Sequence, residues 1–210
     1  MSDRQLWESA AFRLKTELER ELLENSGLEQ RREYLGMSAI GRCPRALYQQ
    51  YVNGRSQMTI RHHYFCWVGY LFEDALAGLF GERLQARGVE VVADFDDRFR
   101  GHVDFVTVES DPVEVKSVSW HKFKAVRSGG PTPPHWSQMQ MYLHHGGWAR
   151  GFIVYVARDA LWKELGTLPL RVFEVRPSQP LVEQLNDKAR RVLAAVDAGR
   201  PPVCECGYCR

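Results

Sequence analysis

The order of the expected helices and strands indicates an α/β domain built around one mixed sheet. Three observations support this fold class. Apolar residues recur with a helical period near both ends of the chain, they alternate with a period of two between residues 89 and 118, and they form strand-like runs at 151–157 and 170–175. The core order is therefore helix, three strands, helix, strand, in a chain of 210 residues that can bury a real core as one domain.

Proline and glycine residues set the expected boundaries of these elements. Pro44 suits the first turn of a short helix, because its missing N–H would be unpaired there anyway, and Gly88 is expected to cap a long helix. Residues 119–134 are rich in Lys, Ser, Gly and Pro, and we expect them to form a loop. Helices are expected at 3–24, 44–52, 60–87, 135–146 and 179–198, and strands at 89–92, 101–108, 112–118, 151–157 and 170–175.

Composition narrows the range of functions. The net charge of +2 is too small to indicate a nucleic-acid binder, so any basic patch must come from local clustering. The N-terminus is densely charged and does not read as a signal peptide, and no stretch approaches the ~20 apolar residues of a membrane span. We therefore expect a cytoplasmic protein with no membrane partner, whose five cysteines are thiols or metal ligands rather than disulfides.

Two carboxylates and a lysine on neighbouring expected strands suit metal-assisted chemistry. Glu114 and Lys116 are two residues apart and therefore share a strand face. Asp104 lies on the preceding strand, and a three-residue loop at 109–111 would place it opposite Lys116 and diagonal to Glu114. Hard oxygen ligands suit Mg²⁺ or Mn²⁺, which activates water beside a phosphate, while the lysine stabilises developing charge. The alternative is a surface hairpin with one solvated ion pair.

Two expected helices carry polar residues with spacings that fit the same site. Gly69 and Glu73 are one turn apart on the long helix, where Glu73 lies at the edge of an apolar stripe and would supply a third acid. Gln138 and Tyr142 are four residues apart and share a helix face. Each pair also fits an ordinary amphipathic helix, in which Glu73 is a boundary carboxylate.

In this order, Gly-x-x-x-Glu, Gly-x-x-Asp, Glu-x-Lys and Gln-x-x-x-Tyr resemble the motifs of the RecB-like branch of the PD-(D/E)XK nucleases over residues 69–142. The resemblance implies a restriction-endonuclease-like core, with a mixed central sheet flanked by helices, and Mg²⁺- or Mn²⁺-dependent hydrolysis of DNA. Many members of this branch carry His where this chain has Glu73. The catalytic residues that the resemblance implies are Asp104, Glu114, Lys116, Gln138 and Tyr142. The metal ligands that it implies are Glu73, Asp104, Glu114 and the backbone carbonyl of Val115.

Three cysteines lie within the last seven residues, as Cys204-x-Cys206-x-x-Cys209. Thiols this close can bind a soft metal centre but need a fourth ligand, for which Cys43 and Cys66 are the candidates. Cys66 lies in an apolar helix turn and suits a small buried hydrophobe. Cys43 heads a short helix, whose N-terminus favours a thiolate.

One cysteine before the nuclease motifs and three after them is similar to the iron–sulfur members of this branch, which include the CRISPR-associated RecB-type adaptation exonucleases and the AddB nuclease domain. The contracted Cys-x-Cys leaves zinc as an alternative metal. A CRISPR-associated role would place the protein in antiviral defence, while phage and repair settings stay open. The resemblance implies a [4Fe–4S] cluster that staples the chain ends around the core, held by Cys43, Cys204, Cys206 and Cys209.

Basic and aromatic residues interleave in the 119–134 segment, as is typical of surfaces that bind single-stranded DNA. The alternative is a solvated loop with incidental charge. The expected DNA contacts are made by Trp120, Lys122, Lys124 and Arg127, with Arg42 and Arg45 at a positive entrance.

The sequence therefore predicts a metal-dependent DNA exonuclease or end-processing nuclease that acts on single strands or free ends. A second hypothesis is a non-catalytic, metal-stapled DNA-binding subunit of an integrase or helicase complex, and a third is a zinc-tailed protein-interaction module. The expected organisation is an N-terminal helical region 1–58 that contributes Cys43, a nuclease core 59–198, and a cysteine-rich tail 199–210.

Overall fold

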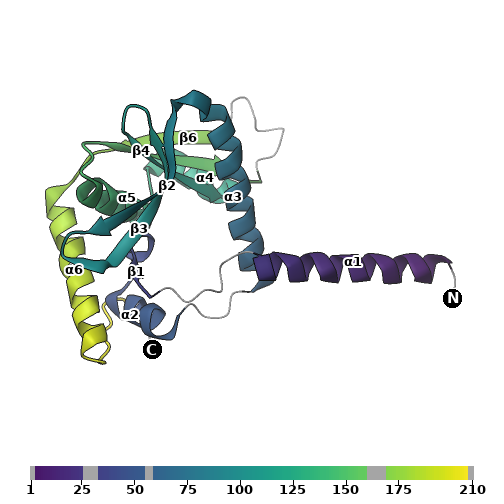
Figure 1. Ribbon diagram of the computed structural model, residues 1–210, viewed down its shortest axis with the longest axis horizontal. Helices are drawn as coiled ribbons and strands as arrows, with labels where there is room; N and C mark the ends of the chain where they lie inside the picture. The colour runs from purple at the N-terminus through teal and green to yellow at the C-terminus, as the bar shows by residue number, and fades with distance from the viewer. Residues whose placement is uncertain (1–2, 26–32, 55–58, 160–168, 208–210) are drawn as a thin grey trace.

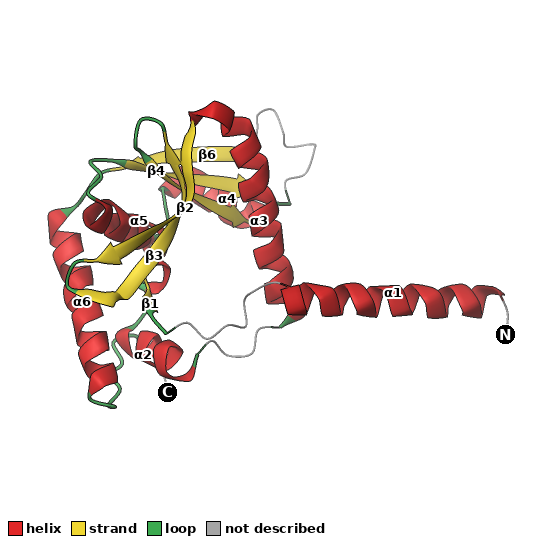
Figure 2. Ribbon diagram, viewed as in Figure 1, coloured by secondary structure: helices red, strands yellow, loops and turns green. Residues whose placement is uncertain are grey.

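A computed structural model describes residues 3–25, 33–54, 59–159 and 169–207 (Figure 1). A central sheet has helices on both of its faces, and one helix, α1, extends away from the rest of the molecule (Figure 2). The expected mixed α/β class is confirmed. Within these described ranges, no helix is both long and apolar enough to cross a membrane.

The sheet has the strand order β1-β3-β4-β5-β6, and β2 pairs with β3 outside this path. β1 pairs with β3, and β4 with β5, in parallel; the β2–β3, β3–β4 and β5–β6 pairs are antiparallel. The sheet is therefore mixed, as expected. The strands are β1 (Leu35–Gly36), β2 (Leu84–Ala93), β3 (Asp96–Thr107), β4 (Pro112–Val118), β5 (Gly151–Ala157) and β6 (Leu170–Val175).

The helices divide between the two faces of the sheet according to the two apolar clusters that they form. α3 packs its Leu76 against Phe105 and against the valines of β4 and β5 that point to its side. Buried residues of α4, α5 and α6 join the larger cluster on the other face, which also contains Leu35, Met37, Ile40 and Leu47 of the N-terminal region. The helices are α1 (Asp3–Asn25), α2 (Pro44–Asn53), α3 (Ile60–Phe80), α4 (Trp120–Gly129), α5 (Pro133–Gly146) and α6 (Gln179–Asp197), with 3₁₀ turns η1 (Met37–Ala39) and η2 (Gly81–Arg83).

One edge of β3 is divided between two neighbours, and this division creates the position of the site. β2 pairs along nearly the whole length of β3. On the opposite edge, β1 pairs with Phe99 and Arg100, and β4 pairs with Phe105 and Val106. Residues 101–104 belong to neither of these two ladders. The Gly-x-x-Asp motif therefore lies where the sheet opens.

Two expectations from the sequence are wrong. α3 ends at Phe80, where Gly81 has a φ of 52°, and residues 84–87 begin β2, because pairing with β3 overrides their helix propensity. Gly88 lies inside β2 and caps no helix.

The expected loop 119–134 contains α4, which Ser119 caps through its hydroxyl and which buries Phe123 and Val126 in the larger cluster. The expected helices at both ends of the chain and the strands β4, β5 and β6 are confirmed, with boundaries that differ by at most one residue.

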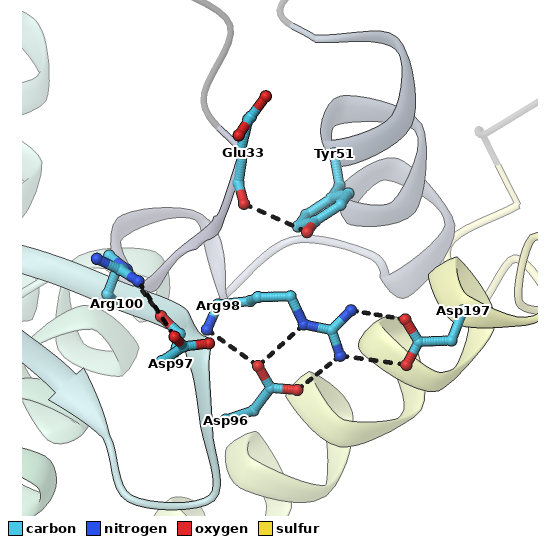
Figure 3. Close-up of polar contacts among 7 residues, drawn as sticks. All are labelled: Glu33, Tyr51, Asp96, Asp97, Arg98, Arg100 and Asp197. Atoms are coloured by element: carbon cyan, nitrogen blue, oxygen red, sulfur yellow. Dashed lines mark hydrogen bonds and ion pairs between the residues drawn. The ribbon is translucent and has the colours of Figure 1, made fainter.

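One guanidinium joins the start of β3 to the end of α6 (Figure 3). Arg98 donates to both carboxylate oxygens of Asp96 and, at 2.6 and 3.1 Å, to both oxygens of Asp197. Asp197 is the last residue of α6 and precedes the cysteine-rich tail. In the same view, the Tyr51 hydroxyl of α2 donates to the Glu33 carbonyl at 3.3 Å. These contacts fix the two ends of the described core near each other.

The buried side chain of Gln140 fixes α5 to the segment between β6 and α6. Its amide nitrogen donates to the Arg176 carbonyl at 2.8 Å, and its oxygen accepts from the Ser178 amide at 2.6 Å. Gln140 is fully buried, so its side-chain amide depends on these two backbone groups for its hydrogen bonds.

Gln140→Met should therefore lower the free energy of unfolding by about 1–3 kcal/mol, because it leaves two partly buried backbone groups without this partner. Chemical denaturation measures the change. The matched control is Gln179→Met on the exposed first turn of α6, which should stay within roughly 0.5 kcal/mol of the wild type. Equal effects of the two substitutions would show that Gln140 is not an anchor.

Candidate active site

The register between β3 and β4 brings the two motif carboxylates to one face. Phe105 lies opposite Val113, and the Thr107 amide donates to the Asp111 carbonyl to close a three-residue turn at 108–110. Continuing this register places Asp104 opposite Glu114, and not opposite Lys116 as the sequence predicts. The loop has the odd length that this arrangement requires, but it lies one residue earlier than 109–111. Asp104, Glu114 and Lys116 still share a face, because the side-chain period is two.

The carboxylate of Glu114 is the centre of this site, and its two oxygens have different surroundings. Oε1 accepts from the Lys116 ammonium at 2.6 Å and from the Gln138 amide at 2.7 Å. Oε2 is buried and has no hydrogen-bond partner within the described ranges. Glu114 itself is 3% exposed. A buried carboxylate oxygen without a donor is costly, and a divalent cation is the partner that would satisfy it.

Gln138 and Tyr142 of α5 form a hydrogen-bonded chain behind Glu114. The Gln138 amide also donates to the Tyr142 hydroxyl at 2.9 Å, and that hydroxyl donates to the His102 carbonyl at 2.8 Å. This last bond satisfies β3 where the sheet opens. Gln138 and Tyr142 are 3% and 1% exposed, so they position Glu114 rather than face solvent.

Gly101, the first residue of the Gly-x-x-Asp motif, is required by the close approach of Tyr142. A Cβ at position 101 would lie 2.7 Å from a carbon of the Tyr142 ring and 3.1 Å from its hydroxyl. Gly69 has no such neighbour within 4 Å, so the spacing of Gly69 and Glu73 reflects no close packing at the glycine. Close packing therefore explains the glycine at position 101, and among the described residues it does not explain the glycine at position 69.

The pKa values of the acids and of the lysine at the site are shifted by burial and by the neighbouring charges. Burial, and then the proximity of Glu114, raise the pKa of Asp104 well above its usual value. Burial, and then the proximity of Glu114, also raise the pKa of Glu73 on α3. In the described part of the chain, however, the carboxylate oxygens of Glu73, Asp104 and Glu114 do not all lie within 4.8 Å of one another. Burial acts to lower the pKa of Lys116, but the carboxylates of Glu114 and Asp104 outweigh it and raise this pKa. Lys116 is therefore protonated at neutral pH, and three carboxyl groups, those of Glu73, Asp104 and Glu114, lie near this one ammonium.

The backbone of Val115 joins the same cluster. Its N–H donates to Asp104 Oδ2 at 2.6 Å, beyond the last β3–β4 pair at Phe105 and Val113. The N–H and C=O of one strand residue point to the same edge, so the Val115 carbonyl also points toward Asp104. The predicted backbone ligand therefore lies on the side where the carboxylates gather.

The predicted DNA contacts lie on two separate parts of the fold. Trp120, Lys124 and Arg127 share one face of α4, with Lys124 5.9 Å over the Trp120 ring and with both cations exposed. Lys122 is exposed on another face of the same helix. Arg42 and Arg45 flank Cys43 instead, and Arg42 donates to Gln50.

Three of the four predicted cysteine ligands lie together. The sulfur atoms of Cys43, Cys204 and Cys206 all lie within 4.8 Å of one another, while Cys209 lies outside the described residues. Burial acts to raise the pKa of the Cys43 thiol, but backbone N–H groups of Glu205 and of the first turn of α2 outweigh it and lower this pKa to about 6. Cys66, on α3, is not part of this group.

One pair beside the site was given no role by the sequence. His135, in the first turn of α5, lies 2.7 Å through Nδ1 from the hydroxyl of Tyr155, which is the register partner of Lys116 on β5. The available signal was the spacing of His135 and Gln138, which are three residues apart on one helix face.

No known family model matches the sequence, and no curated protein is significantly similar to it. The structure resembles SSO0001, with a TM-score of 0.60 and 18% identity over 93% of this chain and 92% of that one. It also resembles an alkaline exonuclease from Laribacter hongkongensis in complex with dAMP, with a TM-score of 0.62 and 13% identity over 80% and 90% of the two chains. A phage-related exonuclease from Haemophilus somnus 129PT gives 0.53 and 14% over 77% and 81%. The chain therefore has the fold of these exonuclease structures.

The raised pKa of Asp104 predicts how stability depends on pH. A carboxyl whose pKa is higher in the folded than in the unfolded protein reduces stability as pH rises above its unfolded value. Metal-free Asp104→Asn should therefore melt at a higher temperature than the wild type at pH 8, and the difference should shrink as pH falls toward 4. Asn retains an acceptor for the Val115 amide.

Melting curves in EDTA across this pH range measure the effect. The matched control is Asp97→Asn, whose carboxylate is 83% exposed on the same strand and which should show no such trend. A difference for Asp104→Asn that is constant with pH would contradict the predicted charge repulsion.

Proposed function

We propose that this protein is a metal-dependent DNA nuclease that hydrolyses phosphodiester bonds in single-stranded DNA or at free DNA ends. The observation that carries the proposal is the Glu114 carboxylate, which has one oxygen fixed by Lys116 and Gln138 and the other buried with no donor among the described residues. Surplus acid from Asp104 and Glu73 supports it. The similarity to structures described as exonucleases, one of them in complex with dAMP, points to DNA as the substrate.

Mg²⁺ and Mn²⁺ prefer oxygen ligands, which Asp104, Glu114, Glu73 and the Val115 carbonyl would provide. The three carboxylates do not all lie within 4.8 Å of one another in the described part of the chain, so a bound ion would draw them together. When bound, such an ion would polarise a phosphate and lower the pKa of a water molecule. It would also offset the burial and, after it, the carboxylate repulsion that raise the carboxyl pKa values of Asp104 and Glu73.

The side chains of the protein have distinct tasks in this proposal. The raised pKa of Lys116 keeps it protonated, so it stabilises negative charge on the phosphate and does not act as a general base. Gln138 and Tyr142 hold Glu114 in one orientation from behind, through three hydrogen bonds that end on the β3 backbone. Exposed Lys122, Lys124 and Arg127 with Trp120 on α4 would bind the strand through phosphates and one stacked base.

Asp104→Asn, Glu114→Gln and Lys116→Met should each reduce Mn²⁺-dependent cleavage of a labelled single-stranded oligodeoxynucleotide by at least about a hundredfold, because each removes charge from the reacting phosphate or its metal. Gel analysis of the products measures the rates. The control is Glu109→Gln, an exposed acid in the turn of the same hairpin, which should leave cleavage unchanged.

Undiminished cleavage by Lys116→Met, in protein free of contaminating nuclease, would contradict the assignment. A wild-type protein that binds the oligonucleotide but does not cleave it with either metal would instead favour a DNA-binding subunit that acts with a partner.

We further propose that Cys43, Cys204, Cys206 and Cys209 bind one metal centre that staples the tail to α2. The N–H groups directed at Cys43 stabilise a thiolate, which is the form that binds metal. The resemblance of the cysteine arrangement to the iron–sulfur nucleases supports a [4Fe–4S] cluster. The sulfur separations within 4.8 Å instead support the alternative, a single zinc ion, because thiolates on one ion lie closer together than thiolates on four different irons.

Cys43→Ser should abolish metal binding at this centre and lower the melting temperature, because the link closes roughly 160 residues of chain and so restricts the unfolded state. Metal and acid-labile sulfide analysis of anaerobically purified protein should show four irons and sulfide for a cluster, or one zinc for the alternative. Cys66→Ser is the matched control and should keep its metal. Wild-type protein with neither metal would contradict the staple.

A further inference from the structure

The imidazole of His135 is hydrogen-bonded to the hydroxyl of Tyr155, next to Lys116. Tyr155 is fully buried on β5, where it is the register partner of Lys116. Its hydroxyl lies 2.7 Å from His135 Nδ1, and the two rings lie 5.5 Å apart. His135 is half-buried and heads the helix that carries Gln138 and Tyr142.

The other bonds of the Tyr155 hydroxyl determine where its proton goes. The Thr132 backbone N–H donates to this hydroxyl at 3.2 Å. Within the described ranges, His135 Nδ1 is the one acceptor within hydrogen-bond distance of the hydroxyl, so we assign the phenol proton to the bond with Nδ1. The proton of the neutral imidazole consequently lies on Nε2. In the part of the chain that the structure describes, Nε2 has no hydrogen-bond partner.

The surroundings of His135 keep it neutral. Burial lowers the pKa of His135 to about 3, with further lowering from the nearby cations Lys116 and Lys122. A neutral N–H donor beside two ammonium groups suits an anion with several acceptor oxygens. A phosphate diester of DNA has this chemistry. In the proposed function, Lys116 binds the scissile phosphate, which would therefore lie near His135.

We propose that His135 is a substrate-contacting residue of this site, whose Nε2–H donates to a phosphate oxygen of the DNA strand while Tyr155 fixes the orientation of the ring. This inference rests on the proposed nuclease function. It assigns two tasks to one face of α5: Gln138 orients Glu114, and His135, one turn earlier, binds the strand.

Two substitutions separate substrate binding from a purely structural role. Asn places its amide near the position of Nδ1 and so retains the contact to Tyr155, whereas Gln places its amide near the position of Nε2. His135→Asn should keep the melting temperature of the wild type but raise the Kd for a fluorescein-labelled single-stranded oligodeoxynucleotide about ten- to a hundredfold, since the lost bond is to a charged group. His135→Gln should recover part of this loss. His144→Asn, an exposed histidine in the last turn of α5, is the matched control and should bind normally.

The salt dependence of binding tests whether the donor is neutral. A lost cation reduces the slope of log Kd against log salt by about 0.7 for a single strand, whereas a lost neutral donor leaves the slope unchanged. His135→Asn should therefore weaken binding at an unchanged slope, and Lys122→Gln should reduce the slope. A slope reduced equally by both substitutions would overturn the neutral donor.

The remaining outcomes distinguish this inference from the function on which it rests. If the unaltered protein is an active nuclease and His135→Asn binds and cleaves the oligonucleotide equally well, the inference is overturned and the proposed function is not. A wild-type protein that neither binds nor cleaves the oligonucleotide overturns the proposed function, and the inference with it.

Discussion

The buried carboxylate of Glu114 is the constraint on which the rest of this structure depends. A carboxylate that is 3% exposed is stable only with compensating partners, and here Lys116 and Gln138 both bind one oxygen. Gln138 must come from a helix that lies close against the sheet. That approach is possible because Gly101 leaves room for the Tyr142 ring. The opening between β1 and β4 along β3 then gives the Tyr142 hydroxyl a free backbone carbonyl at His102.

The position of α5 is set by contacts at several points along its length. Gln140 binds the segment before α6, His135 binds Tyr155 of β5, and Gln138 binds Glu114. These contacts orient the helix beside carboxylates whose ionised form is disfavoured, because burial and then the proximity of Glu114 raise the pKa values of Asp104 and Glu73. A well-anchored helix beside buried carboxyl groups with raised pKa values is typical of a site whose free energy of unfolding increases when a ligand binds.

The sequence predicts local elements well where local and long-range forces agree, and less well where they conflict. β4 and β5 have strongly apolar runs, and both match their predicted boundaries. Residues 84–87 favour a helix locally but pair with β3, which no local pattern reveals. α4 was missed because Gly129 and Gly130, which end it, suggested a loop throughout. The sequence could not decide the length or the position of the hairpin turn, because adjacent registers have similar turn residues; the odd loop in the structure places the acids on one face. His135 was missed because its role comes from Tyr155, which is distant in sequence.

The segment between η1 and α2 connects the cysteine group to the candidate active site by packing. Met37 is fully buried beside Gly101, where a Cβ would lie 3.1 Å from its own, and so lies against the strand that the Tyr142 hydroxyl contacts. Four residues later, Gly41 lies against Pro134 so closely that a Cβ would be 2.8 Å from its Cα, directly before His135. Lys188 of α6 then holds this segment through the Ile40 and Arg42 carbonyls, next to Cys43. Since the interior is close-packed, this segment joins the cysteine group to the first turn of α5 by direct side-chain and backbone contacts.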